Sequence, residues 1–129
     1  MSISRILFQS IPVEDQDRAL AFYTENLGFD VHTDVPYGEN WRWIFLTLPG
    51  AETRLHFAAK DDMTVNNKPV LVLVSDDVDP EAVRLRDAGV EITGGPDAAP
   101  WAPGTRWLMI RDSERNLVLL ESFEDGADV

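Results

Sequence analysis

The stretch Glu14–Val31, with the sequence EDQDRALAFYTENLGFDV, decides the predicted fold. Asp15 predicts the start of a helix, because its carboxylate can accept hydrogen bonds from the first free backbone N–H groups. Gly28 predicts the end of that helix, because glycine readily adopts the left-handed conformation there. One apolar face at helical spacing is formed by Ala19, Phe22, Tyr23 and Leu27. Alternating segments precede and follow the helix, so the unit is strand, helix, strand.

The same unit recurs in the second half of the chain. Val70–Val74 predicts a buried strand, and Asp79–Glu81 predicts the start of a helix with proline at its first position. Gly89 closes that helix. The segment 42–46 (RWIFL) is echoed by 106–110 (RWLMI), and each precedes a turn and a last strand. This internal repeat predicts an α+β fold of two βαβββ modules.

Further segments complete the predicted outline. Strands are expected over Ser4–Val13, 41–48, 53–59 and 117–121, with loops over 35–40 and 94–104. The second loop is rich in glycine, proline and alanine and contains Trp101, and loops of that length in small domains often close over a site.

The length predicts a single domain. Module one covers about 4–60, the linker 61–68, module two about 69–123 and an acidic tail 124–129.

Composition restricts the function classes. The formal net charge is −12 and the pI is about 4.3, which disfavours nucleic acid and anionic membranes as partners. The chain has no cysteine, which excludes disulfides and thiol chemistry. No apolar run approaches a membrane-spanning length, and the N-terminus lacks the pattern of a signal peptide. The expected location is therefore the cytoplasm.

Several of these motifs carry a family resemblance. Asp15, the run ALAFY at 19–23, the run LGF at 27–29 and the turn Asp112–Asn116 resemble the vicinal oxygen chelate superfamily, with Arg115 where glycine is usual. That superfamily includes glyoxalase I, extradiol dioxygenases and bleomycin resistance proteins. The resemblance covers about residues 4–123. It implies that the modules form a cup-shaped mixed sheet, commonly around a divalent metal, and that the protein is a homodimer.

The resemblance also implies where metal ligands would lie. His56 is assigned by the pattern Leu55-His56-Phe57, whereas counting through the internal repeat gives Leu55. The neighbour of the first position, Gln9, should face away. His56 and Glu121 are the only weak candidates for ligands, so no metal cofactor is expected, with a divalent metal as the alternative. The four implied positions are Phe8, His56, Val70 and Leu119.

Without a metal, the predicted cup has apolar walls and few polar groups, which is typical of small-molecule pockets. The preferred function is binding of a small cationic or aromatic molecule. The alternatives are a metal-dependent lyase or dioxygenase with an atypical site, and a structural dimer, in which the tryptophans would be subunit contacts. The expected ligand-binding residues are Phe8, Ser10, Trp43, His56, Val70, Val72, Trp101, Trp107, Leu119 and Glu121.

Overall fold

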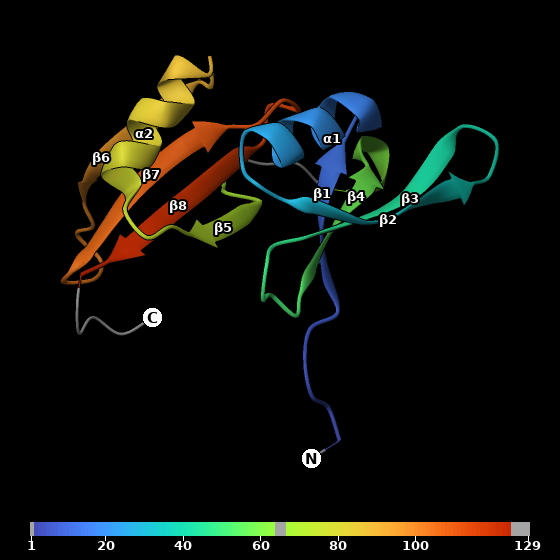
Figure 1. The fold of residues 1–129 in the computed structure, drawn as a ribbon, viewed down its shortest axis with the longest axis horizontal. Helices are drawn as coiled ribbons and strands as arrows, with labels where there is room; N and C mark the ends of the chain where they lie inside the picture. The colour runs from blue at the N-terminus through green and yellow to red at the C-terminus, as the bar shows by residue number, and fades with distance from the viewer. Residues whose placement is uncertain (1, 64–66, 125–129) are drawn as a thin grey trace. The chain divides into compact units, whose positions relative to one another are not determined.

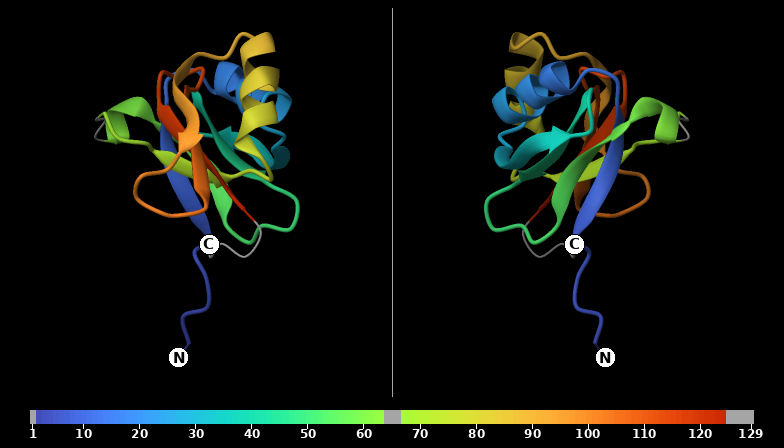
Figure 2. Two further views of the ribbon diagram at one scale, coloured as in Figure 1. Left: turned by 90° about the vertical axis from the view of Figure 1, so that its left-hand side faces the viewer. Right: turned by 90° about the vertical axis from the view of Figure 1, so that its right-hand side faces the viewer.

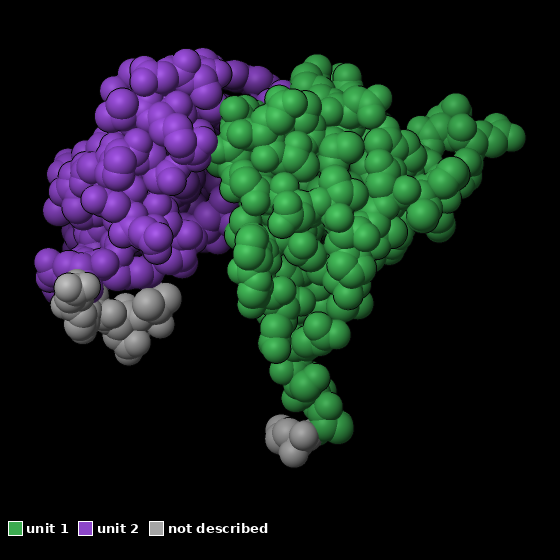
Figure 3. Space-filling view, viewed as in Figure 1, with its two compact units in different colours: residues 1–66 green, residues 67–129 purple. Residues whose placement is uncertain are grey.

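The protein is described by a computed structural model that covers residues 2–63 and 67–124. It divides into two compact units, residues 1–66 (unit 1) and 67–129 (unit 2) (Figure 3). Part of the predicted linker, 61–68, and most of the predicted acidic tail, 124–129, lie outside the described residues. The single-domain assignment stays a prediction.

Unit 1 contains one helix and a four-stranded mixed sheet (Figure 1). The strand order is β1-β4-β3-β2, and β1 pairs with β4 in parallel while the other pairs are antiparallel. A short 3-10 turn, Lys60–Asp62, follows the last strand. The elements are β1 (Phe8–Val13), α1 (Gln16–Glu25), β2 (Asp30–Tyr37), β3 (Trp41–Thr47) and β4 (Arg54–Ala59).

Unit 2 repeats this plan with the strand order β5-β8-β7-β6. Its first and last strands, β5 and β8, also pair in parallel, and the remaining pairs are antiparallel. The predicted α+β fold of two βαβββ modules is therefore confirmed. The elements are β5 (Leu71–Val74), α2 (Val78–Asp87), β6 (Ile92–Ala98), β7 (Thr105–Arg111) and β8 (Leu117–Phe123).

The first helix begins where its sequence predicts and ends at Glu25, before Leu27, which was predicted to lie on its apolar face. Asp15 is the N-cap, and its Oδ1 accepts a hydrogen bond from the Arg18 N–H at 3.1 Å. Gly28, just beyond the helix, has a φ of 76°. Tyr23 is fully buried and its ring lies 5.9 Å from that of Phe57 on β4. These contacts hold α1 against one face of the unit 1 sheet (Figure 2).

The second helix starts two residues earlier than predicted. Asp77 is the N-cap, with its Oδ1 accepting from the Asp79 N–H, so the helix begins at Val78. Pro80 is consequently the third helical residue rather than the first. This position is tolerated because the N–H groups of the first helical turn have no partner within the helix. The helix packs on β6, β7 and β8.

Three predicted segments differ in the structure. The first strand starts at Phe8 and not at Ser4, because its partner β4 starts opposite it at Arg54. The predicted loop 35–40 is shorter, since β2 continues to Tyr37, which pairs with Trp41. The predicted loop 94–104 is wrong over its first half, which forms β6 and pairs with β7 through two register shifts. Pairing with a neighbouring strand outweighs the local preference of glycine and proline for loops.

Strand alternation gives each sheet one face toward its helix and one face away from it. The fully buried side chains of β1, β3 and β4 point to the helix side in unit 1, and those of β7 and β8 do so in unit 2. The opposite faces carry the candidate site. Neither helix of the described residues is long and apolar enough to cross a membrane. The buried side chains include Ile11, Val13, Ile44, Leu46, Phe57, Leu108, Ile110 and Val118.

Candidate functional site

The helix-free face of the unit 1 sheet gathers aromatic rings around one histidine. We call this set, Phe8, Ser10, Trp43, Phe45 and His56, the unit 1 face. Ser10 lies opposite His56 in the parallel β1–β4 ladder, and Phe45 lies opposite His56 on β3. The ring centroid of Trp43 is 4.5 Å from that of His56, and those of Phe8 and Phe45 are 5.0 and 5.6 Å from it. All four unit 1 residues predicted for the site lie here.

His56 is the polar centre of the unit 1 face. It is 8% exposed, and its Nδ1 lies 2.9 Å from the Ser10 Oγ. Its buried Nε2 has no hydrogen-bond partner among the described residues. Burial lowers the pKa of His56 below its usual range, because the charged form loses hydration. A neutral imidazole can donate at Nε2 in one tautomer and accept there in the other, so this atom can bind either kind of polar ligand group.

The sequence left open whether His56 or Leu55 lies on the face that carries the candidate site, and the pairing of β1 with β4 decides this. His56 shares the face of Phe8 and Ser10, whereas Leu55 is 3% exposed on the helix side. Gln9, the neighbour of Phe8, is exposed, and its amide donates to the Ser10 carbonyl.

Two aromatic residues of unit 1 were missing from the predicted site. Phe45 lies within the unit 1 face. Its position two residues after Trp43 in the same strand places both on one face, so the sequence could have identified it. Tyr37 lies 5.7 Å from Trp43 between ring centroids and was assigned to a loop.

The helix-free face of the unit 2 sheet carries the other predicted residues. We call Val72, Trp101, Trp107, Leu119 and Glu121 the unit 2 face. Val72 pairs with Leu119, and Trp107 pairs with Glu121. Trp101 comes from the loop after β6, and its indole Nε1–H donates to Glu121 Oε1 at 3.2 Å.

Val70 lies just before β5, two residues from Val72 and therefore in phase with it. Its backbone N–H donates to the Leu117 carbonyl at 2.9 Å. The six predicted residues of unit 2 thus gather at one sheet face. Val70 lies at the end of this face, and Trp101 reaches it from the loop.

The residues at the implied metal positions do not suit a metal ion. Phe8, Val70 and Leu119 have side chains of carbon alone and cannot coordinate, which leaves His56 as a single donor from that set. Within residues 2–63 and 67–124, no group of three or more histidine, aspartate or glutamate side chains is placed to hold a metal. A metal-free site stays a prediction that elemental analysis can test.

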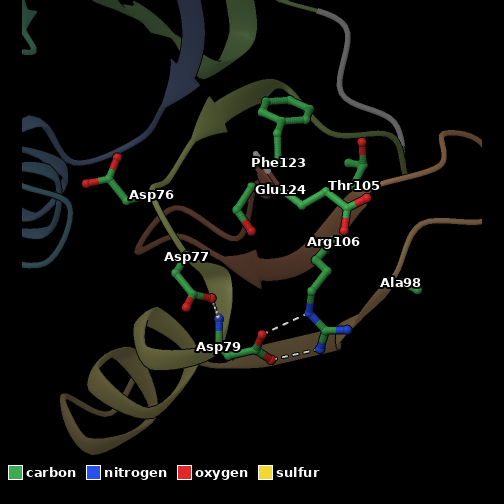
Figure 4. A pocket seen from close by; sticks show the side chains of 10 residues that line it. Asp76, Asp77, Asp79, Ala98, Thr105, Arg106, Phe123 and Glu124 are labelled. Carbon is green, nitrogen blue, oxygen red and sulfur yellow. Dashed lines mark hydrogen bonds and ion pairs between the residues drawn. The ribbon is translucent and has the colours of Figure 1, made fainter. Parts of the chain in front are cut away.

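A separate pocket of unit 2, with a volume of about 460 Å³, was not predicted (Figure 4). Arg106 forms two hydrogen bonds of 2.8 Å to the Asp79 carboxylate, which hold the pKa of that carboxyl below its ordinary value. Asp77 caps α2, so these charges already serve the fold. No residue of the unit 2 face lines this pocket. Its lining is Asp76, Asp77, Asp79, Ala98, Gly104, Thr105, Arg106, Ser122, Phe123 and Glu124.

Comparisons with known proteins agree with this architecture. The family model of the Glyoxalase/Bleomycin resistance protein/Dioxygenase superfamily matches residues 2–120. YetH of Bacillus subtilis (strain 168) is 33% identical over 121 residues, which cover 92% of this chain and 98% of YetH. The crystal structure of TnmS3, an antibiotic binding protein from Streptomyces sp. CB03234, is 35% identical with a TM-score of 0.82 and covers 96% of this chain and 99% of TnmS3. A superfamily member from Sphaerobacter thermophilus is 27% identical, with the same TM-score and coverages of 95% and 99%.

Proposed function

Because this chain belongs to the glyoxalase/bleomycin resistance protein/dioxygenase superfamily, we propose that it binds a small aromatic molecule on its apolar sheet faces without a metal. The observation that carries the proposal is the buried, unpartnered Nε2 of His56 among three aromatic side chains. Such a buried polar atom costs free energy in the unliganded protein, and a ligand that bonds to it removes that cost. The similarity to TnmS3, described as an antibiotic binding protein, supports this class of ligand.

The packing around His56 suggests how a ligand would be detected. Nε2 is covered, and Trp43 has the nearest ring, so a ligand that reaches this nitrogen must displace a neighbouring ring. Aromatic ligands can then stack on the same rings. Binding should therefore change the environment of Trp43 and its fluorescence.

The experiment is a titration of intrinsic tryptophan fluorescence with neutral polycyclic aromatic compounds that carry one hydrogen-bonding group. His56→Phe keeps an aromatic ring and removes the polar atom, so we expect about tenfold weaker binding, which is the value of one hydrogen bond. Trp43→Phe should remove most of the fluorescence change.

The matched control is His32→Phe, the same substitution at an exposed histidine of the same sheet, which bonds to Thr33. The ring of His32 lies 6.5 Å from that of Phe45, and phenylalanine keeps this ring contact. It should leave the affinity unchanged. Binding that is equal in the wild type and His56→Phe, or no response to any compound, contradicts the proposal.

Elemental analysis separates this function from the metal-dependent alternative. Protein purified without chelators or an affinity tag should contain no stoichiometric transition metal, even after supplementation during growth. One equivalent of zinc, nickel, iron or manganese per chain would overturn the proposal and favour a lyase or dioxygenase. A homodimer and a cytoplasmic location belong to the same proposal, and sedimentation and fractionation test them.

A further inference from the structure

Glu121 is an unusual residue for the unit 2 face. It is half-buried, and within the described part of the chain its carboxylate pairs with no arginine, lysine or histidine. Its hydrogen bond comes from the indole N–H of Trp101 at 3.2 Å. Its neighbours across the strands are Trp107 and Val74, which is 64% exposed. A half-buried negative charge therefore lies beside tryptophan and valine side chains, and no ion pair of the described residues neutralises it.

The two tryptophans beside Glu121 are held in defined positions. Trp101 is 56% exposed, yet its N–H is fixed by the carboxylate. The six-membered ring of Trp107 lies against Gly94, where an added Cβ would come within 2.7 Å of the ring. The two ring centroids are 6.1 Å apart with an interplanar angle of 44°. The indole rings thus form a small tilted pair next to the charge.

We propose that Trp101, Trp107 and Glu121 form a recognition site for an organic cation, either a quaternary ammonium or a protonated amine. Indole faces attract such cations through the partial negative charge of the ring face, and more strongly where the cation loses water on binding. The carboxylate supplies the opposite charge, and the net charge of −12 favours the approach of cations. Neutral ligands gain only the apolar contact.

This site deepens the proposed function, because it rests on the sheet faces being the ligand-binding surface. The two faces would then recognise different kinds of ligand group. The unit 1 face suits a neutral aromatic system with one hydrogen-bonding group, and the unit 2 face suits a positive charge.

The test compares choline with 3,3-dimethyl-1-butanol, which has the same shape without the charge. Intrinsic tryptophan fluorescence of the full chain is titrated with each compound at constant ionic strength. We expect choline to bind about tenfold more tightly than the alcohol, since one charge-selective contact of this kind is worth about 1.4 kcal/mol. Glu121→Gln keeps an acceptor for the Trp101 N–H, removes the negative charge and should reduce the preference several-fold.

The matched control is Glu91→Gln, which removes one negative charge from an exposed ion pair with Arg115 in the same unit. It should retain the preference for choline. Trp101→Leu serves as a second variant that leaves the carboxylate in place and should also weaken choline binding. Circular dichroism of each variant establishes that it is folded.

Other results overturn the inference. Equal responses to choline and the alcohol, or no response to choline, would show that no cation site exists. A preference that is unchanged in Glu121→Gln, or that is reduced equally in Glu91→Gln, would show that Glu121 is not part of a cation site. If neutral aromatic compounds still bind in a His56-dependent manner in any of these cases, the proposed function stands and only the cation site fails.

Discussion

The two units share an element order and differ in the chemistry of corresponding sheet faces. In unit 1, the face away from the helix surrounds a neutral, buried imidazole with aromatic rings. In unit 2, the corresponding face exposes valine and tryptophan side chains around a carboxylate. The backbone plan therefore does not determine the site. Side chains at alternate strand positions can change on one face while those of the core face keep packing against the helix.

The units also differ in the turn before their last strand. In unit 1 the Ala51 N–H donates to the Leu48 carbonyl, and Gly50 has a φ of 78°. In unit 2 a buried carboxylate organises the turn, because Asp112 accepts hydrogen bonds from the backbone N–H groups of Glu114 and Asn116, each at 2.8 Å. One turn depends on backbone conformation and the other on a side chain.

The largest effect should come from breaking the unit 2 turn with Asp112→Ala. The side chain is 4% exposed, and its loss leaves buried N–H donors without an acceptor. We expect the free energy of unfolding to fall by about 3 kcal/mol, measured by urea denaturation. Ser113→Ala, at the adjacent half-exposed position, removes one hydrogen bond to Glu114 and should cost about 1 kcal/mol. Equal losses in the two variants would contradict the role assigned to Asp112.

A pair of exchanges at the same turns should have smaller and opposite effects. Gly50→Ala should cost about 1 kcal/mol, because a left-handed conformation is unfavourable for alanine even where its Cβ has open space. Arg115 has a φ of 69° in the unit 2 turn, so Arg115→Gly should gain about 0.5 kcal/mol after the loss of its exposed ion pair.

Thermal unfolding measures the change in stability caused by each of the two substitutions. The control is Arg115→Ala, which removes the ion pair with Glu91 and keeps the unfavourable conformation. It should therefore give no gain. A loss of stability in Arg115→Gly would mean that this arginine stabilises the turn by other contacts.

The smallest effect concerns the pH dependence that His56 contributes to unit 1. The pKa of His56 is lowered in the folded protein, so the unfolded chain binds the proton more readily. Stability should therefore fall as the pH drops below about 6.5, the ordinary histidine value, toward the lower pKa of the folded state. Urea denaturation at pH 5.5 and 7.5 should show a smaller difference in His56→Phe than in the wild type. His32→Phe should keep the wild-type difference, and an unchanged difference in both variants would contradict the assignment.

Local signals in the sequence predicted much of this fold. Asp15 marked the start of the first helix, and Gly28 marked the left-handed residue that follows its end at Glu25. The repeat of strand, helix and strands marked the second module. The segment 94–98 was misassigned because its glycines and proline favour loops, whereas its pairing with β7 is a contact with residues distant in the sequence. Ser4 was wrongly placed in a strand because alternation alone does not reveal where the partner strand begins.

The candidate site was predictable only in part. Residues on alternate strand positions, such as Phe8 and Ser10, could be assigned to one face from spacing. The sheet face on which His56 lies could not be assigned without the register between β1 and β4, which places His56 opposite Ser10. The bond between Trp101 and Glu121 and the ion pair between Arg106 and Asp79 each join positions at least 20 residues apart, and no local pattern indicates such contacts.

The parallel pairing of first and last strands has a consequence for synthesis of the chain. Ser10 on β1 meets His56 on β4 across 46 residues, and β5 meets β8 over a similar separation. Neither sheet can be completed until its last strand has left the ribosome, and closing a connection of this length slows folding. Because unit 1 emerges first, its sheet can close while unit 2 is still being translated. The His56 cluster can thus form during translation, before the last strand of unit 2 has been synthesised.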